Sequence, residues 1–263
     1  MLDFDRLKIF IPLEFCKIKE ELFNNRLNST ISIPNEYFSS FIGLNYIGYN
    51  KDYQNVVIEI TGRINATKGY LGFINKSNIY KALEKVKATK YVDFNTKKVL
   101  EIAEVGVCHI TKDITVNDIF ATKFDFIKHV KLYCNKYIVI DYEYGGIDIH
   151  PIPKTRKDKL TIYPKFNELS LEENRIYRNI IGTDFMYENE NLLRFELQLN
   201  DYRQIRRFFD MEKNQPIMLK DLLNSSKNPL MREMAELGLL GGEWKSERKN
   251  GVKYSKWEGI RVF

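Results

Sequence analysis

A tyrosine near the end of a short alternating segment is the residue of this sequence best suited to act as a nucleophile. In KLTIYPK, residues 159–165, apolar and polar residues alternate, which predicts a strand with Tyr163 and Lys165 on one polar face. A tyrosine hydroxyl has a pKa of about 10, so at neutral pH it needs a nearby cation or a metal-polarised phosphate to attack. Lys165 could offset the developing charge. These residue types predict phosphoryl transfer through a covalent phosphotyrosine.

Two further alternating segments bring an imidazole and carboxylates to polar faces. In VGVCHITKDIT, His109 and Asp113 share a face, and in LLRFELQL, Glu196 faces away from the apolar side chains. His109 and Asp113 are separated by about 13 Å of extended strand, so one ion cannot bind both without a bulge. We therefore expect His109 to bind a hard divalent ion with Glu196 from a neighbouring strand, with Glu59 or Asp113 as substitutes for Glu196. The ion would polarise the scissile phosphate and stabilise the leaving 3′-oxygen.

The alternation by itself has an ordinary explanation, because a half-solvated antiparallel sheet produces it without any site. That explanation does not account for the combination of a tyrosine, a histidine, carboxylates and cations on one polar face. For each residue alone a structural role stays open. Tyr163 could be packing, His109 could be a structural strand histidine, and Glu196 could form a cross-strand ion pair with Arg194.

Basic residues precede the tyrosine segment and share one face of a predicted helix. PKTRKDK leads into the tyrosine strand, and DYRQIRRFF places three arginines at i, i+3 and i+4. Such groups position the DNA backbone by contacting phosphates, and a solvated loop or helix face is the alternative. The predicted phosphate contacts are Lys154, Arg156, Lys157, Arg203, Arg206 and Arg207. Tyr142, Tyr144 and Tyr202 could stack on unpaired bases or pack in the fold.

Hydrophobic periodicity predicts a mixed order of strands and helices. Strands are expected at 6–13, 54–64, 104–116, 159–165 and 190–199, a hairpin at 137–152, and helices at 75–86, 95–103, 117–133 and 201–209. This order predicts an α+β fold, in which a central, mainly antiparallel sheet carries helices on its apolar face and leaves its polar face open to DNA. We expect one domain over residues 1–214 and a small helical C-terminal appendage over residues 215–263.

Composition narrows the class of protein. The 263 residues are enough for a sizeable core, and a net charge of +6 permits nucleic-acid binding without proving it. No run of about 18 apolar residues exists and the N-terminus lacks a basic segment, so neither a membrane span nor a signal peptide is expected. The three scattered cysteines suit a reducing cytoplasm, not a disulfide framework or a zinc site.

Several segments, in order, resemble the phage and plasmid replication-initiation proteins related to the filamentous-phage gene II protein and to the plasmid rolling-circle initiators. The segments are VVIEITGRI, YLGFINKSNIYKALEKV, AEVGVCHITKDITV, DKLTIYPKFNEL and LLRFELQLND, and they fall within residues 56–209. Their order, and the pairing of IYxK with RFE, carry the resemblance. It implies an HUH-like sheet of the nickase or relaxase type, with Tyr163 as the nucleophile, Lys165 as its neighbour and Glu196 as a metal-binding or basic carboxylate. Pro164 stands where the family usually has Asp, and His109 where Asp is common.

The resemblance implies a rolling-circle replication initiator that nicks and rejoins one strand of its origin DNA with Mg²⁺ or Mn²⁺. Origin DNA, as single strand or supercoiled duplex, is the expected partner, and host replication proteins are possible further partners. A non-catalytic DNA-binding replication or copy-control protein on the same sheet is the main alternative. A third hypothesis is a metal-dependent nuclease that uses water, in which Tyr163 only packs.

Overall fold

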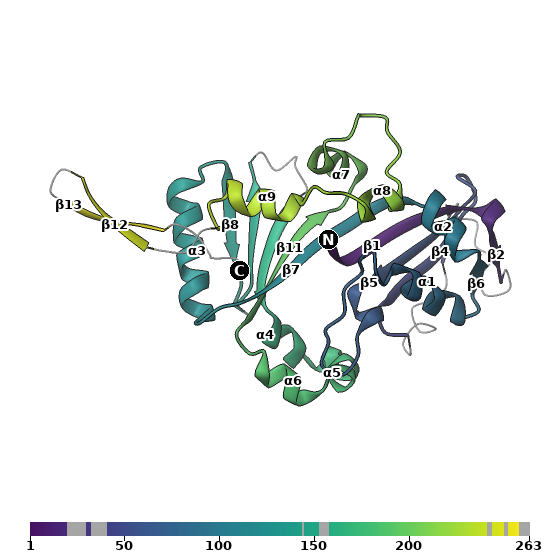
Figure 1. Ribbon diagram of the computed structural model, residues 1–263, viewed down its shortest axis with the longest axis horizontal. Coiled ribbons are helices and arrows are strands. Elements are labelled where there is room, and N and C mark those ends of the chain that lie inside the picture. The colour runs from purple at the N-terminus through teal and green to yellow at the C-terminus, as the bar shows by residue number, and fades with distance from the viewer. Residues whose placement is uncertain are drawn as a thin grey trace.

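A nine-stranded antiparallel sheet forms the centre of the molecule in the computed structural model, which describes residues 1–19, 30–32, 41–143, 145–152, 158–240, 244–249 and 252–257 (Figure 1). In spatial order its strands are β3 (Thr30–Ser32), β4 (Leu44–Asn50), β5 (Asn55–Thr61), β1 (Asp3–Pro12), β7 (Glu104–Thr115), β11 (Leu192–Leu199), β10 (Lys159–Pro164), β9 (Ile147–Pro151) and β8 (Tyr137–Asp141). Each neighbouring pair is antiparallel. The expected α+β fold with a mainly antiparallel sheet is confirmed.

Nine α-helices, two short strand pairs and three 3-10 helices (Leu13–Phe15, Gly62–Asn65 and Glu172–Asn174) make up the other regular elements of the described part of the chain. The helices are α1 (Ile79–Ala88), α2 (Thr96–Ile102), α3 (Ile119–Tyr133), α4 (Lys165–Ser170), α5 (Arg175–Ile181), α6 (Thr183–Glu188), α7 (Tyr202–Phe209), α8 (Leu219–Leu223) and α9 (Pro229–Glu236). The small pairs are β2 (Cys16–Ile18) with β6 (Val92–Phe94), and β12 (Trp244–Lys249) with β13 (Val252–Trp257). No helix among the described residues is long and apolar enough to cross a membrane.

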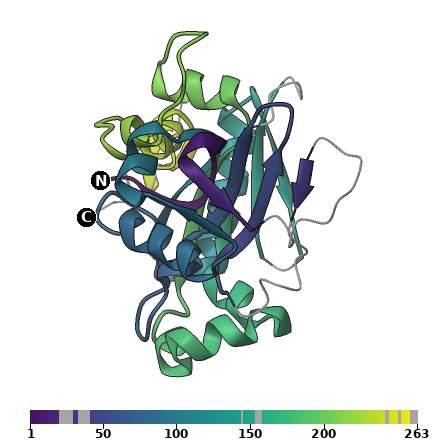
Figure 2. The ribbon, with the colours of Figure 1, turned by 90° about the vertical axis from the view of Figure 1, so that its right-hand side faces the viewer.

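The alternating sequences of the strands give the sheet one apolar face. In β11, Leu193, Phe195, Leu197 and Leu199 are all buried, because every second side chain points to the same side. Apolar residues of helices α1, α2, α3, α7, α8 and α9 bury in the same core. Figure 2 shows α1 and α2, in blue, on one side of the sheet. Burial of this face is the main source of the fold's stability.

Helices α4, α5 and α6 pack in a second, smaller cluster at the end of the sheet. Their residues Leu169, Tyr177 and Ile181 are buried together with Leu71 and Leu192. Figure 2 shows these helices, in green, at the lower end of the molecule. Because α4 begins directly after β10, this cluster fixes the end of the strand that carries Tyr163.

The chain after residue 214 docks on the main sheet before it changes from helix to strand. Leu219 of α8 and Met234 of α9 are fully buried in the main core, and the backbone N–H of Val105 donates to the carbonyl of Ile217 at 2.8 Å. The last described segments, β12 and β13, are strands and not the helices expected in this part of residues 215–263.

Two phenylalanines provide a matched test of the core. Phe195 is fully buried and its ring lies 5.9 Å from that of Phe126, whereas Phe120 of α3 is 76% exposed. Phe195→Ala is expected to lower the free energy of unfolding by about 3–5 kcal/mol, because it leaves a cavity. Phe120→Ala should change it by less than about 0.5 kcal/mol. Urea denaturation of both variants measures this, and equal losses would contradict the assignment of the core.

Candidate functional site

Three cross-strand rungs on β10, β11 and β7 assemble the polar face. Residues that are directly opposite in antiparallel strands point to the same side of the sheet, so each rung brings its side chains together. The rungs are Tyr163–Arg194–Asp113, Thr161–Glu196–Thr111 and Lys159–Gln198–His109. Alternation puts the predicted tyrosine, glutamate and histidine on the polar face of their own strands. The pairing of β10 with β11 and of β11 with β7 then makes them neighbours on one face of the sheet.

Glu196 joins the tyrosine to the histidine. The hydroxyl of Tyr163 donates to Glu196 Oε2 at 3.3 Å, and His109 Nδ1 lies 2.7 Å from Glu196 Oε1. Because Oε1 is an acceptor, Nδ1 of His109 carries the hydrogen in this pair. Gln198 Nε2 donates to the same oxygen at 2.9 Å, and His109 Nε2 lies 3.1 Å from Asn200 Oδ1. The result is a continuous chain of hydrogen bonds from phenol to imidazole.

The tyrosine and the glutamate line a pocket of about 520 Å³. Asp148 also lines this pocket, and it accepts hydrogen bonds from Lys159 Nζ at 2.6 Å, Thr161 Oγ1 at 2.7 Å and the Tyr142 hydroxyl at 3.1 Å. A pocket of this size accepts a nucleotide-sized group. The half-buried Tyr163 thus shares this pocket with Glu196, whereas His109 is buried and is not among the lining residues.

Burial sets the protonation of both groups. Burial raises the pKa of the Tyr163 hydroxyl well above 10, and the carboxylates of Glu168 and Glu196 add to this effect, so the phenol is neutral at neutral pH. Burial also acts to raise the pKa of Glu196, but the hydrogen bond and charge of His109, together with Arg194, lower it below its ordinary value. Glu196 is therefore ionised and accepts from a protonated phenol.

Asp113 is held by an arginine beneath the tyrosine. Arg194 is fully buried and forms two hydrogen bonds to Asp113, at 2.7 and 2.8 Å, and one to Asp5 at 2.6 Å. Both carboxylate oxygens of Asp113 are thus occupied by a guanidinium. The structure places this predicted metal ligand in a buried ion network and outside the residues that line the pocket.

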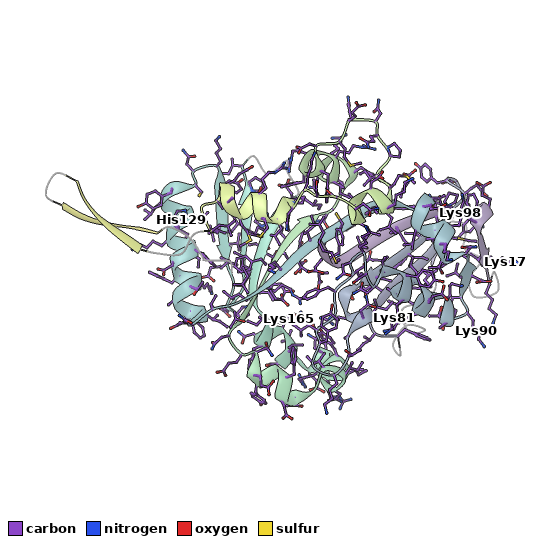
Figure 3. All side chains as sticks on the ribbon, in the orientation of Figure 1. Lys17, Lys81, Lys90, Lys98, His129 and Lys165 are labelled. Atoms are coloured by element: carbon purple, nitrogen blue, oxygen red, sulfur yellow. The ribbon has the colours of Figure 1, made fainter. Side chains whose placement is uncertain are left out.

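Lys165 lies in a different element from the one predicted. Strand β10 ends at Pro164, which also precedes the first helical residue of α4, so Lys165 begins that helix and does not continue the strand face. Figure 3 shows Lys165 where the sheet meets α4. It is buried, forms an ion pair with Glu168, and its Nζ lies 5.7 Å from the centre of the Tyr163 ring. Lys165 is a buried cation behind the tyrosine and does not line the pocket.

The donor set near Glu196 fits a metal only in part. Among the described residues no group of three or more His, Cys, Asp or Glu could hold an ion. His109 and Glu196 meet, and the amide oxygen of Asn200 is beside the imidazole, whereas Glu59 pairs with Arg6 at 2.7 Å. Mg²⁺ often uses one or two carboxylates together with substrate phosphates. These residues therefore suit an ion that arrives with a phosphodiester better than one bound permanently.

The predicted phosphate contacts are only partly described. Lys154, Arg156 and Lys157, like Tyr144, lie outside the described residues. On α7, Arg203 is exposed, Arg206 donates to the carbonyl of Gln215 at 2.8 Å, and Arg207 pairs with Asp158 at 2.7 Å. Two of the three arginines in the predicted stripe are therefore engaged within the protein.

Sequence reasoning missed several residues that hold the site. Asn200 follows the last strand, Asp148 belongs to the hairpin strand β9, and Glu168 binds both Lys165 and, at 2.6 Å, Arg63. Only Glu168 had a local signal, since a lysine and a glutamate three residues apart in a helix are neighbours. The other contacts join segments far apart in the chain, so spacing cannot show them.

Glu168 makes the stability of this region dependent on pH. Burial acts to raise its pKa, but Lys165, Arg194 and Arg63 lower it to about 2 from an ordinary value of 4.5. The stabilisation is present above pH 4.5 and is lost as pH falls toward 2, and it corresponds to about 3 kcal/mol. Glu168→Gln should therefore cost about 3 kcal/mol at pH 7 and progressively less below pH 4.5.

Urea denaturation from pH 7 to pH 3 measures the difference between the wild type and Glu168→Gln. Glu172→Gln is the matched control, because that side chain is 82% exposed and should show almost no difference at any pH. A cost of Glu168→Gln that stays constant down to pH 3 would show that the charge of Glu168 does not stabilise the fold.

Comparisons with known proteins add no family to these observations. No protein-family model matches the sequence, and no curated protein matches it. The likeness to replication initiators therefore rests on the short segments quoted above. A function for this chain has to come from the chemistry of the side chains that the fold brings together.

Proposed function

We propose that this chain is a rolling-circle replication initiator that nicks and rejoins one strand of DNA through a covalent bond to Tyr163. The observation that carries the proposal is the hydrogen bond from the Tyr163 hydroxyl to Glu196, inside a pocket and next to His109. A nucleophile, a base and a group that orients the base are the parts that nucleophilic catalysis requires. Origin DNA, as single strand or supercoiled duplex, is the proposed substrate.

The chemistry can be followed atom by atom. The Tyr163 oxygen attacks phosphorus, the bond from phosphorus to the 3′-oxygen breaks, and its electron pair leaves with that oxygen. Glu196, 3.3 Å from the phenol, accepts the phenolic proton and can return a proton to the 3′-oxygen. The products are a 5′-phosphotyrosine and a free 3′-hydroxyl. Since the phosphotyrosine conserves the energy of the broken bond, the reverse reaction reseals the strand.

His109 and the buried cations have supporting roles in this proposal. The imidazole holds the Glu196 carboxylate in place and stabilises its charge, as the lowered pKa of Glu196 indicates. Arg194 lowers the pKa of the Tyr163 hydroxyl, against the larger effect of burial, and Lys165 lies near the ring. Both therefore favour the negative charge that develops on the phenol oxygen during attack.

Mg²⁺ or Mn²⁺ is part of the proposal as an ion that binds together with the DNA. His109 Nε2 and the amide oxygen of Asn200 would hold it, with phosphate oxygens as further ligands, while Glu196 keeps the imidazole in place through the hydrogen on Nδ1. When bound, such an ion polarises the scissile phosphate. Nicking should accordingly stop on addition of EDTA and resume with excess Mn²⁺.

A non-catalytic DNA-binding protein is the second candidate, and the state of Tyr163 favours it. A hydroxyl whose pKa is raised well above 10 is a weaker acid than free tyrosine, and its ordinary role would be to donate a hydrogen bond to Glu196. In that case the polar face would bind origin DNA for replication or copy control without cutting it. Detection of a covalent adduct separates the two candidates.

Tyr163→Phe provides the direct test. The wild type should convert supercoiled plasmid, carrying the DNA that flanks its own gene, to open circles with protein attached when Mn²⁺ is present. The variant should form less than about one thousandth of the adduct, because phenylalanine has no nucleophilic oxygen. Labelled DNA resolved on a denaturing gel measures it, and binding should be unchanged.

Tyr80→Phe is the control, since Tyr80 lies on α1 and is 46% exposed. It should form the adduct at the wild-type rate. Adduct formation by Tyr163→Phe would reject Tyr163 as the nucleophile. Nicking without any adduct would favour a nuclease that uses water, and DNA binding without nicking would favour the non-catalytic candidate.

A further inference from the structure

A second pocket, of about 620 Å³, lies on the same face of the sheet as the candidate site. Arg6 of β1 is paired with His109, so Arg6 shares the face of His109 and Glu196. Alternation along β1 puts Phe10 on this face too, and Phe10 lines the second pocket. We call this cavity the aromatic pocket. Its lining includes Phe10, Tyr53, Tyr202, Asn50, Asn55 and Glu104.

The aromatic pocket presents ring surfaces. The centres of the Phe10 and Tyr202 rings are 6.2 Å apart, and the Tyr53 side chain is 76% exposed. Gly106 lies beneath Phe10, where an added Cβ would be 2.3 Å from the ring, so the glycine leaves room for it. The Arg206 guanidinium lies 5.7 Å from the centre of the Tyr202 ring. Rings with a nearby cation are the usual means of binding unpaired bases next to phosphates.

The polar groups of the pocket are suited to the edge of a base. Asn55 Oδ1 is buried and has no hydrogen-bond partner among the described residues. A buried acceptor without a partner is unfavourable, so rotation of the Asn55 side chain toward a base N–H in the pocket would gain a hydrogen bond. Asn50 Oδ1 accepts from the backbone N–H groups of Asp52 and Tyr53 at 3.0 and 3.1 Å, which fixes the turn that carries the Tyr53 ring.

We propose that the aromatic pocket binds an unpaired base of the DNA strand whose phosphodiester reaches Tyr163. This inference rests on the proposed function, and it assigns to the pocket a nucleobase as its ligand. Tyr163 is level with Asp113 of β7, and Phe10 is level with Glu104 of the same strand. Asp113 and Glu104 are nine residues apart along β7. That separation is about 30 Å. It falls within the stretch that a single-strand site of about 4–16 nucleotides covers.

A base held at this distance would fix which phosphate reaches the tyrosine. The polar face between the two pockets carries Lys8, a cation on the route of the backbone, and Arg6, which pairs with Glu59 at 2.7 Å. The rigid sheet then sets the distance from the bound base to the cutting position. The choice of the phosphodiester that is cut would therefore depend on the aromatic pocket. The rate of the chemical step at Tyr163 would not depend on it.

The test compares two fluorescein-labelled strands, a 20-residue oligo(dT) and a 20-residue abasic strand that keeps the phosphates. Fluorescence anisotropy with the Tyr163→Phe protein gives Kd for each without cleavage. The wild-type pocket should bind oligo(dT) more tightly than the abasic strand. Tyr53→Ala and Tyr202→Ala should each reduce that ratio about tenfold, the effect of losing one stacked base. Both variants should bind the abasic strand normally.

Tyr53→Ala protects the test against misfolding, because Tyr53 is largely exposed, and Tyr80→Ala on α1 is the matched control. A ratio that neither Tyr53→Ala nor Tyr202→Ala changes would overturn the inference. If, in that case, the protein with Tyr163 intact still formed the covalent adduct, the proposed function would hold without the inference about the aromatic pocket. A reduced ratio without any adduct would support the pocket in a non-catalytic DNA-binding protein. Failure to bind either strand would reject both proposals.

Discussion

The carboxylate of Glu196 is the group on which the candidate site depends. It accepts from Tyr163 and Gln198 and faces the imidazole of His109, so three side chains from three strands take their positions from it. Burial of such a carboxylate is unfavourable unless partners satisfy it. The hydrogen bond and charge of His109, with Arg194, more than offset burial, since the pKa of Glu196 is lowered. The protein therefore keeps a negative charge beside a neutral phenol.

A second buried network supports this pair from behind. Arg194 joins Asp5 and Asp113, and Glu168 joins Lys165 and Arg63. The Arg194 network connects β1, β7 and β11, and the Glu168 network connects the start of α4 with Arg63, which follows β5. Removing one partner from such a network leaves a buried charge unpaired, which is strongly destabilising. The polar side of the sheet is thus held by buried ion pairs, whereas the apolar side is held by hydrophobic burial.

The sequence predicts the fold class and part of the site because both depend on alternation. Tyr163, Glu196 and His109 are assigned to polar faces by period alone, and the register then makes them neighbours. Lys165 was misplaced because Pro164 ends the strand one residue earlier than the pattern suggests. Asp113 has the right face, but its partner Arg194 lies 81 residues away along the chain, so the ion pair is visible only in three dimensions. The partners of Asn200 and Asp148 were hidden for the same reason.

The most direct measurement is the site of DNA attachment. After reaction with supercoiled plasmid and Mn²⁺, nuclease and trypsin digestion should release the peptide Leu160–Lys165, LTIYPK, which contains a single tyrosine. The account predicts that mass spectrometry finds this peptide with a 5′-linked nucleotide on Tyr163. A nucleotide on another tyrosine, or nicked DNA with this peptide wholly unmodified, would contradict it.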